Sequence, residues 1–459
     1  MSDEQDAFEL EELEYRAAAE TAYQGLLDRI GEAQPQPRLE PTRKAAELLG
    51  DPHRAYPIIH VTGTNGKTST SRMIESILRA YGLRTGLLTS PHLERVNERI
   101  MIDGRPISNR AFAENWGDIQ PYLGIVDAEL IAAGEEPLTF FEALTVLAFA
   151  SFAEAPVDVA VLEVGMGGEW DSTNVADGQV AVFSPIALDH VQRLGSTIGQ
   201  IARTKSGIIK PLAAVVSAEQ TTEAVQALRE AAELSEATLA LEPEAFALTA
   251  SSVAVGGQLV SIRGIAGRYD DLFLPLYGDH QGHNAALAVA AVEMFLGNGS
   301  QPLDHDVLSE GLGAATSPGR LQLIGIEPTV LVDAAHNPHG AASLAAALRT
   351  YFDFDEFCFV VGILADKDAE GILEELRPLA ARFHITKSPS DRAIPAHELA
   401  DRAAPVAGQE LVHEYDTLEA AVDEAREWAV QSPRRAVVIT GSITLVGEAI
   451  ALAGTEGWK

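Results

Sequence analysis

The chain has 459 residues, of which 46% are hydrophobic and 22% are charged, the profile of a water-soluble globular protein. This length allows two or three domains that each bury a core of their own. Glycine and proline follow no period, so a collagen-like or disordered chain is excluded. Cys358 is the only cysteine, which excludes a disulfide scaffold and fits the reducing cytoplasm, where we expect the protein to work.

Acidic residues outnumber basic residues by 67 to 33, and the formal net charge is −34. This charge argues against binding to the phosphate backbone of a nucleic acid. No apolar run is as long as the about 18 residues that a membrane-spanning helix requires. Residues 1–15 are acidic where a targeting peptide would be basic, so we expect either a solvated, disordered tail or an exposed helix there. An anionic ligand must therefore be attracted locally, by a few cations, helix N-termini or metal ions.

Short apolar runs alternate with helical stretches from about residue 57 to residue 320. The runs at 56–61, 157–164 and 180–186 are rich in β-branched residues. Continuous apolar strands separated by helices indicate a buried, mostly parallel sheet, so the predicted fold class is α/β.

The strongest local signal is Gly63-Thr-Asn-Gly66-Lys67-Thr68, which follows the first of these strands and precedes an amphipathic helix. Its glycines let backbone N–H groups curve around phosphate oxygens at the positive end of that helix. Lys67 could reach the β- and γ-phosphates, and the Thr68 hydroxyl could contact Mg²⁺. Val61 replaces the usual first glycine, so the match is to a shorter variant, and a glycine-rich turn without a ligand stays open.

Thr139 is followed three residues later by Glu142, just before the apolar stretch 143–152. This spacing is typical of a capping box, which opens a helix. Spacing alone gives no argument that this segment binds a ligand.

Glu163 and His190 lie near the ends of two successive strands. Ligands of open α/β sheets bind beyond the carboxyl ends of the strands, so both side chains should reach the edge that carries the phosphate loop. A buried acid is costly unless it is paired or binds a metal, which makes Glu163 a candidate Mg²⁺ ligand. His190 is the less natural ligand because Mg²⁺ prefers oxygen. A salt-bridged strand end and an ordinary loop histidine remain the alternatives.

Lys205 lies on the apolar stripe of a predicted helix, with Ile201 and Ile208 at helical spacing on the same side. A lysine in that place either extends its ammonium group to solvent or is held in a polar pocket and chemically altered. From the residues alone we favour extension to solvent.

The runs at 259–263 and 272–277 sit among glycine and turn residues, which predicts a small antiparallel insert. The turn-like residues 317–319 are the predicted domain boundary. We therefore expect an N-terminal ATP-binding domain over 1–317 and a smaller Rossmann-like α/β domain over 318–459. Strands of the second domain are predicted at 330–332, 357–361, 383–386 and 436–440.

Asp333 and His336 follow the strand at 330–332 and precede an alanine-rich helix. Asp333 could accept hydrogen bonds from ribose hydroxyls, as acids at strand ends do in nucleotide-binding folds, and His336 could reach a phosphate. Arg320 could clamp a phosphate through two hydrogen bonds. The alternatives are an Asn-Pro turn with polar side chains and a surface arginine.

With these motifs, the chain resembles the folylpolyglutamate synthase/dihydrofolate synthase family, a branch of the Mur-type ATP-dependent amide ligases, from about residue 40 to residue 450. The phosphate loop is shared by many Mur-type ligases. The motifs more specific to the folate branch are Thr89-Ser-Pro-His92 with Asn97-Glu-Arg-Ile100, Glu163-Val-Gly-Met-Gly-Gly168, Asp171-Ser-Thr-Asn174, Leu188-Asp-His190, Lys205-Ser-Gly-Ile-Ile-Lys210, His280-Gln281 with Asn284, Pro318-Gly-Arg320, Asp333-Ala-Ala-His-Asn-Pro338 and Asp366-Lys-Asp368.

The resemblance implies roles for the matching positions. ATP would be bound by Gly63, Thr64, Asn65, Gly66, Lys67 and Thr68, with Asn284, Arg320 and Asp333 completing the nucleotide site. Two Mg²⁺ ions are expected, and Ser90, Glu163 and His190 would be ligands, which moves the hydroxyl ligand from Thr68 to Ser90. Lys205 matches a lysine that is carbamylated in the family, and its carbamate would support the second ion. Catalytic roles would fall to Lys67, Lys205, His190 and His336.

The resemblance also implies where a pterin or folate substrate would bind. Two segments would contact it: Thr139, Phe140, Phe141 and Glu142, and then Trp170, Asp171 and Ser172. Glu169 stands where the family usually has arginine, which exchanges a cation for an anion near the substrate-binding loop.

The implied reaction adds L-glutamate to dihydropteroate, to (tetrahydro)folate polyglutamates or to both, through an acyl phosphate and with release of ADP. The partners would be these small molecules and ATP, with no nucleic acid and no membrane, and we expect a monomer. Two alternatives stay open: a Mur-type ligase that acts on a peptidoglycan precursor, and a P-loop nucleotide-binding protein without ligase activity.

Overall fold

The computed structural model describes residues 2–31 and 34–458, and within the first helix it describes side chains from residue 11 onward. The chain forms two compact units. The first contains the chain up to Leu248 together with Ile262–Asp270 and Asn284–Ala315, and the second contains Thr249–Ser261, Asp271–His283 and the chain from Thr316 onward. None of the described helices is long and apolar enough to cross a membrane.

The first unit is built on an eight-stranded sheet. Its strands are β1 (Ile58–Thr62), β2 (Thr85–Leu88), β3 (Ile100–Ile102), β4 (Arg105–Pro106), β5 (Val159–Glu163), β6 (Val180–Phe183), β7 (Ala214–Ser217) and β8 (Thr238–Leu241). They are ordered β4-β3-β2-β5-β1-β6-β7-β8, and only the β2–β3 and β3–β4 pairs are antiparallel. The predicted α/β class with a mostly parallel sheet is confirmed.

The register of the central strands explains where polar side chains gather. β1 lies between β5 and β6, with Val61 opposite Glu163 and Thr62 opposite Phe183. All five residues of β1 and all five of β5 are buried, as expected for strands covered on both faces. Glu163 is therefore placed directly beside the end of the strand that leads into the glycine-rich loop.

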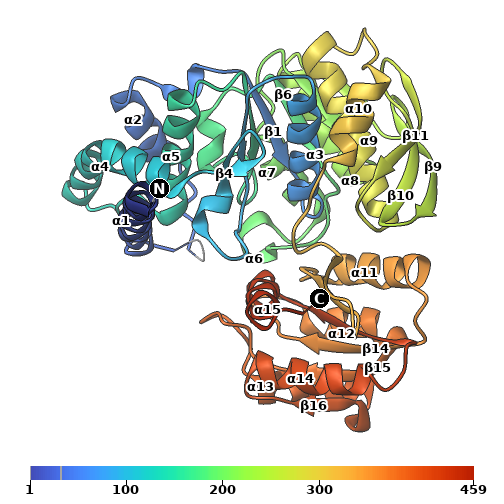
Figure 1. The fold of residues 1–459 in the computed structure, drawn as a ribbon. Coiled ribbons are helices and arrows are strands. Elements are labelled where there is room, and N and C mark those ends of the chain that lie inside the picture. Colours follow the sequence, from blue (N-terminus) through green and yellow to red (C-terminus); the bar gives the residue numbers. More distant parts are fainter. Residues whose placement is uncertain (1, 32–33, 459) are drawn as a thin grey trace. The chain divides into compact units, whose positions relative to one another are not determined.

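Helices of the first unit cover this sheet (Figure 1). They are α1 (Ser2–Leu27), α2 (Glu40–Leu48), α3 (Lys67–Ala80), α4 (Asn109–Ala132), α5 (Phe140–Glu154), α6 (Val191–Leu194), α7 (Ile198–Ser206), α8 (Thr222–Leu234), α9 (Asp279–Gly297) and α10 (His305–Gly313). The described part of the acidic segment, from residue 2 onward, forms the start of α1. α1, α2, α4 and α5 pack against one another on one side of the sheet, whereas α3 packs on β1, β2 and β5.

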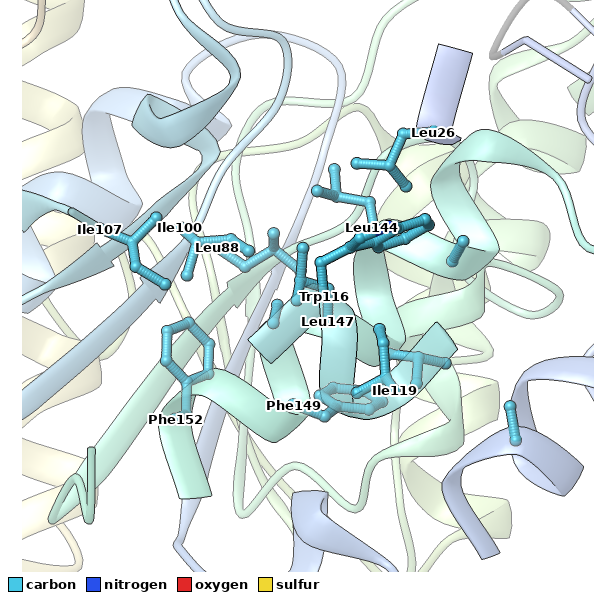
Figure 2. Close-up of a cluster of buried hydrophobic side chains, with 14 of the residues drawn as sticks. Leu26, Leu88, Ile100, Ile107, Trp116, Ile119, Leu144, Leu147, Phe149 and Phe152 are labelled. Atoms are coloured by element: carbon cyan, nitrogen blue, oxygen red, sulfur yellow. The ribbon is translucent and has the colours of Figure 1, made fainter. Parts of the chain in front are cut away.

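The interior of the α1–α4–α5 layer is apolar (Figure 2). Trp116 and Ile119 of α4 meet Leu144 and Phe149 of α5 there. Leu26 contributes from α1, and Leu88 and Ile100 contribute from the strands. Burial of side chains of this size provides ~1.5–3 kcal/mol each. This packing fixes α5, and with it the segment at 139–142 that opens α5.

The second unit holds a six-stranded sheet of order β12-β13-β17-β14-β15-β16. Its strands are β12 (Gln322–Gly325), β13 (Val330–Asp333), β14 (Glu356–Val361), β15 (Ala380–Ile385), β16 (Val412–Glu414) and β17 (Arg435–Thr440), and its helices are α11 (Pro338–Tyr351), α12 (Ala369–Leu376), α13 (Ala396–Ala407), α14 (Leu418–Ala429) and α15 (Ile443–Glu456). Only β12 runs antiparallel to its neighbour. The predicted second α/β sheet is confirmed.

The smaller elements complete the fold. The predicted insert is a three-stranded sheet of order β11-β10-β9, formed by β9 (Ala247–Ala254), β10 (Gly257–Arg263) and β11 (Arg268–Leu274). Short 3₁₀ turns are η1 (Pro52–Arg54), η2 (Val96–Arg99), η3 (Ser172–Val175), η4 (Arg377–Leu379) and η5 (Gln409–Leu411). The sequence analysis did not predict β2, β3, β4, β7, β8, β9, β12 or β16. All of these except β9 have at most four residues and so carry little periodicity.

The net charge of −34 predicts that salt stabilises the fold. Raising NaCl from 20 mM to 1 M should raise the Tm by several degrees, because the Debye length falls to about 3 Å and repulsion between surface carboxylates is screened. Thermal unfolding followed by circular dichroism measures this. Screening predicts that most of the rise occurs below about 0.3 M salt. A Tm that is flat over that range would show that charge repulsion does not limit stability.

Candidate active site

The glycine-rich loop joins β1 to α3 in a conformation that requires glycine at two positions. Gly63 and Gly66 have φ angles of 149° and 87°. A Cβ on Gly63 would lie 1.9 Å from Ser184 Oγ, and a Cβ on Gly66 would lie 2.6 Å from Asn284 Oδ1. The loop thus packs tightly against the end of β6 and against α9, and Asn284 is brought to the loop as the resemblance implied.

Hydrogen bonds tie this loop to the segment that follows β6. The backbone N–H of Thr64 donates to Pro185 O at 2.9 Å. The Thr64 hydroxyl donates to Ala187 O at 3.1 Å and accepts from Ala187 N at 3.0 Å. The Lys67 ammonium group folds back over the loop and donates to the carbonyls of Gly63 and Thr64 at 3.3 and 3.2 Å. A fixed loop with a lysine amine above it is suited to an anionic ligand.

Glu163 ends β5 with its side chain 1% exposed. The Thr68 hydroxyl lies 2.8 and 3.0 Å from its two carboxylate oxygens, and Ser90 N donates to Oε2 at 3.4 Å. The structure therefore brings the Thr68 hydroxyl and the Ser90 backbone N–H to the Glu163 carboxylate, and the sequence analysis named all three residues. Carboxylate and hydroxyl oxygens are the ligand types that Mg²⁺ prefers, so this donor set fits the ion.

Lys205 corrects one of our expectations. The side chain does not extend to solvent: it is 4% exposed, and Nζ donates to Gly63 O at 2.7 Å. Burial lowers the pKa of Lys205 to about 7, and the positive charge of Lys67 acts in the same direction. The helix stripe that carries Lys205 packs beneath the glycine-rich loop, so the amine meets a backbone carbonyl instead of water.

His190 stands at the start of the short helix α6, with a φ angle of 49°. Its backbone N–H donates to Asp189 Oδ1 at 2.8 Å, and Nε2 lies 3.9 Å from Asp189 Oδ2. Within residues 2–31 and 34–458, no group of three His, Cys, Asp or Glu side chains is arranged to hold a metal ion. The structure thus pairs His190 with Asp189, a residue that the sequence analysis did not single out.

The segment at 139–142 forms the predicted capping box at the start of α5. The Thr139 hydroxyl accepts from Glu142 N at 3.3 Å, and Thr139 N donates to Glu142 Oε2 at 2.7 Å. Arg38 binds the same carboxylate through Nε at 3.0 Å and Nη2 at 3.1 Å, and it also donates to the carbonyls of Glu136 and Pro137. The Glu142 carboxylate is therefore engaged within the protein.

Two phenylalanine rings follow Thr139 and lie in different surroundings. Phe140 is buried, with the Arg99 guanidinium 5.1 Å from its ring centroid, and Arg99 Nε donates to His92 Nδ1 at 2.8 Å. Phe141 is half-buried and packs on Gly165, where a Cβ would lie 2.7 Å from the ring. Of the two rings, Phe141 is thus the one that is partly exposed next to the loop that follows Glu163.

The loop at 169–172 is held by buried hydrogen bonds. Asp171 is 4% exposed and accepts from Met166 N and from Thr173 N, both at 3.0 Å. Burial raises the pKa of the Asp171 carboxyl above its ordinary value, although its hydrogen bonds oppose the rise. Trp170 is half-buried, and Glu169 is exposed with its N–H donating to Thr204 O at 2.8 Å. The carboxylate that replaces the family arginine thus lies at the surface of this loop.

In the second unit, Asp333 ends β13 with its side chain buried. It accepts from Leu321 N and Ala335 N, both at 2.9 Å. Burial raises the pKa of the Asp333 carboxyl, and the positive charge of Arg320 opposes that rise. His336 Nδ1 lies 2.9 Å from Ala334 O, and Asn337 caps α11. The Asn-Pro pair therefore starts the predicted alanine-rich helix and is not merely the turn that was left open as an alternative, and Arg320 and Asp333 lie near one another beside it.

One group of polar residues in the second unit was missed by the sequence analysis. The hydroxyls of Ser388, Ser442 and Thr444 lie within 2.6 to 3.2 Å of one another, at the start of α15 and beyond the ends of β15 and β17. Gly441-Ser442 directly after an apolar strand was the available signal, because Gly-Ser at a strand end is typical of a helix start.

Comparison with known proteins places this geometry in a family. The model of the Mur ligase middle domain matches residues 61–292, and that of the Mur ligase glutamate ligase domain matches residues 319–443. A Mycobacterium tuberculosis dihydrofolate synthase/folylpolyglutamate synthase is 42% identical over 447 residues, which cover 92% of each chain. The chain belongs to the folylpolyglutamate synthase/dihydrofolate synthase family of Mur ligases. The resemblance seen in the sequence is confirmed.

Solved structures of the folylpolyglutamate synthase/dihydrofolate synthase family share the fold. The Mycobacterium tuberculosis folylpolyglutamate synthase complexed with ADP has a TM-score of 0.92 at 41% identity, covering 96% of this chain and 99% of that one. Escherichia coli FolC in complex with DHPP and ADP has a TM-score of 0.82 at 28% identity, covering 95% and 98%. The fold and the order of the motifs are thus those of the family along nearly the whole chain.

Replacing Arg38 by methionine should destabilise the protein by about 3 kcal/mol, because the Glu142 carboxylate, whose side chain is 5% exposed, loses its cation. Chemical denaturation measures this. The double variant Arg38→Met/Glu142→Gln should recover most of the loss, since glutamine still completes the capping box.

The matched control is Arg43→Met, because Arg43 and Glu40 form an ion pair with exposed side chains. It should change stability by less than about 1 kcal/mol. Equal losses for Arg38→Met and Arg43→Met would contradict a structural role for the buried pair.

Proposed function

We propose that the protein is an ATP-dependent ligase that adds L-glutamate to dihydropteroate, to (tetrahydro)folate polyglutamates or to both, and releases ADP and phosphate. The observation that carries this proposal is the pair of lysine amines on the Gly63 carbonyl beside buried Glu163, in a chain that matches the dihydrofolate synthase/folylpolyglutamate synthase of M. tuberculosis over 92% of its length. We further propose that it acts as a cytoplasmic monomer, and the buried free thiol of Cys358 is compatible with that compartment.

ATP phosphates would be bound by Gly63, Thr64, Asn65, Gly66, Lys67 and Thr68. What supports this is a loop that requires glycine at two positions and ends at the N-terminus of α3, where backbone N–H groups and the helix dipole attract anions. Asn284, whose side chain packs on Gly66, would contribute to the same site. The proposed second domain, residues 318–459, would contribute two side chains. Arg320 would bind the phosphates, and Asp333 would bind the ribose.

Ser90, Glu163 and His190 are the proposed Mg²⁺ ligands, with two ions in total. Bound Mg²⁺ would neutralise charge on the phosphates during transfer. The oxygen donors around Glu163 support this assignment, and Thr68 supplies a further hydroxyl next to that carboxylate. His190 would contribute from the opposite flank of the glycine-rich loop, with Asp189 orienting its ring.

Lys205 is the proposed site of a carbamate. The amine nitrogen would bond to the carbon of CO₂ and lose one proton to water, which converts a cation into an anion. The support is electrostatic: only a neutral amine attacks CO₂, and burial lowers the pKa of Lys205 to about 7, whereas an exposed lysine stays protonated at neutral pH.

The acceptor would bind at Thr139, Phe140, Phe141 and Glu142 and at Trp170, Asp171 and Ser172. The half-buried rings of Phe141 and Trp170 offer faces on which a pterin ring can stack, whereas the Phe140 ring is buried. Because the Glu142 carboxylate is already bound by Arg38 and Thr139 N, its part would be to orient the two phenylalanines. Asp171 offers a buried carboxylate in the same region.

The chemistry needs two steps because a carboxylate is a poor target for an amine. The acceptor carboxylate would attack the γ-phosphate, forming an acyl phosphate and ADP, and the glutamate amine would then displace phosphate to form the amide. Lys67, Arg320 and His336 would neutralise and orient the transferring phosphoryl group. Alignment of the reactants by such groups supplies ~7–11 kcal/mol of the barrier reduction.

An ADP-release assay tests this function. Dihydropteroate, tetrahydrofolate, a folylpolyglutamate and a UDP-linked peptidoglycan precursor are each supplied with and without L-glutamate, and the product is weighed by mass spectrometry. We expect glutamate-dependent ADP release and a product heavier by one glutamate residue with a pterin acceptor. Lys67→Ala should retain less than about a tenth of the rate with an intact circular dichroism spectrum, because it removes a phosphate contact. Turnover only with the UDP-linked precursor, or ADP release without an amide product, would overturn the proposal.

Lys205→Ala should lose activity and regain part of it when short carboxylic acids such as acetate or propionate are added, because these place a carboxylate in the vacated pocket. Mass spectrometry of the wild-type protein in bicarbonate should show one added carboxyl group at Lys205. Its occupancy should rise with pH through about 7, because the amine loses its proton there. Absence of rescue together with an unmodified lysine would contradict the carbamate.

A further inference from the structure

A chain of three buried side chains links the centre of the main sheet to the loop that follows Glu163. His60 lies in β1 and is 0% exposed. Its Nε2 lies 2.9 Å from the Thr173 hydroxyl, and that hydroxyl donates to Asp171 Oδ1 at 2.5 Å. Thr173 is 0% exposed and Asp171 is 4% exposed, so solvent does not compete for these hydrogen bonds.

The number of available protons decides which group donates in each of these hydrogen bonds. A threonine hydroxyl has one proton, and an ionised carboxylate only accepts, so Thr173 donates to Asp171. Thr173 must then accept from His60, which requires a proton on Nε2. His60 Nδ1 is buried and has no hydrogen-bond partner among the described residues, so a proton there would be unpaired. Burial lowers the pKa of His60 to about 3, and the charge of Lys210 acts in the same direction, in agreement with a neutral ring.

Asp171 connects these hydrogen bonds to the backbone on which the Phe141 ring packs. Its Oδ2 accepts from Met166 N at 3.0 Å, and Gly165, the preceding residue, packs against the Phe141 ring. A second connection runs alongside: Thr145 Oγ1 donates to Phe141 O at 2.8 Å and lies 2.7 Å from Ser172 Oγ. The segment at 171–173 therefore reaches Phe141 only indirectly, through Thr145 to its carbonyl and through Gly165 to its ring.

We propose that His60 and Thr173 are positioning residues for the pterin-bearing acceptor, and that they act through Asp171 and the Gly165–Met166 backbone. This inference rests on the proposed function, because it needs an acceptor that binds at Phe141 and Asp171. Neither residue contacts the acceptor. The hydrogen bond from Thr173 sets which way the Asp171 carboxylate faces. His60 donates to the Thr173 oxygen, so the single hydroxyl proton of Thr173 is directed to Asp171.

The test is the steady-state kinetics of variants along the chain. Thr173→Val and the smaller Thr173→Ala both remove the hydroxyl, and each should raise the KM for the acceptor about tenfold, because a buried carboxylate loses a donor. The KM for ATP should stay within about twofold, since the phosphate loop keeps its own hydrogen bonds. Thr173→Ser retains the hydroxyl and should restore the acceptor KM toward the wild-type value.

His60 is tested by a double variant. His60→Leu alone should raise the acceptor KM by about threefold, because the Thr173–Asp171 bond remains but is no longer directed. Combined with Thr173→Val it should add nothing, since His60 acts only through that hydroxyl. Thr42→Val is the matched control: Thr42 is buried in α2, its hydroxyl has no partner within the described part of the chain, and its loss should leave the acceptor KM unchanged.

The outcomes separate this inference from the function on which it rests. If the wild-type protein shows no acceptor-dependent ADP release, the proposed function fails. If the wild type turns over and the Thr173 variants match Thr42→Val, the positioning role is wrong. Effects of His60→Leu and Thr173→Val that multiply would overturn the connection between the two residues, as would equal changes in the KM values for ATP and acceptor.

Discussion

A single backbone carbonyl organises the candidate active site. The Gly63 oxygen accepts from Lys205 Nζ at 2.7 Å and from Lys67 Nζ at 3.3 Å, so two amines that would repel each other in a low-dielectric interior converge on one acceptor. The arrangement exists because β1 ends in the middle of a parallel sheet, where α3 begins above the loop and α7 packs beneath it. The same crowding excludes a side chain at position 63, which explains the glycine. Burial in the same place lowers the pKa of Lys205 to about 7, and the positive charge of Lys67 acts in the same direction.

This local concentration of amines resolves the conflict between a net charge of −34 and a phosphate-binding role. Long-range attraction cannot bring a nucleotide to such a molecule, and at physiological salt the field is screened within about 8 Å. The attraction must act at contact distance, and the groups proposed for it are Lys67, the start of α3 and cations bound at Glu163. The negative charge of the buried Glu163 carboxylate lies at the same edge of the sheet as the two lysines, and its oxygens are suited to bind a cation there.

The segments proposed to bind the acceptor are held by hydrogen bonds that the acceptor itself would not contact. Arg38 holds the Glu142 carboxylate and two neighbouring carbonyls, and this fixes the turn that carries Phe140 and Phe141. Asp171 holds the loop after Glu163 from the other side. Both anions are buried: Glu142 is paired with Arg38, which lies far away in the chain, whereas Asp171 is held by the neighbouring residues Met166 and Thr173. The aromatic surface is thus pre-organised, which lowers the conformational entropy that ligand binding must remove.

The sequence by itself determined the α/β class, the parallel strands at β1, β5 and β6, the glycine-rich loop, the capping box at Thr139 and the family. Those features are recorded in local patterns: apolar runs, glycine spacing and short motifs in a fixed order. Only the tertiary structure decided that Lys205 is buried under Gly63, that Arg38 occupies Glu142, that His190 pairs with Asp189 and that His60 reaches Asp171 through Thr173. Each of these depends on which side chains meet once the sheet and helices have packed, and except for the neighbouring pair His190 and Asp189 the partners lie far apart in the chain. Helical periodicity shows which face of a helix is apolar, but it does not show whether that face packs against a polar group. For this reason the burial of Lys205 could not be predicted from the sequence.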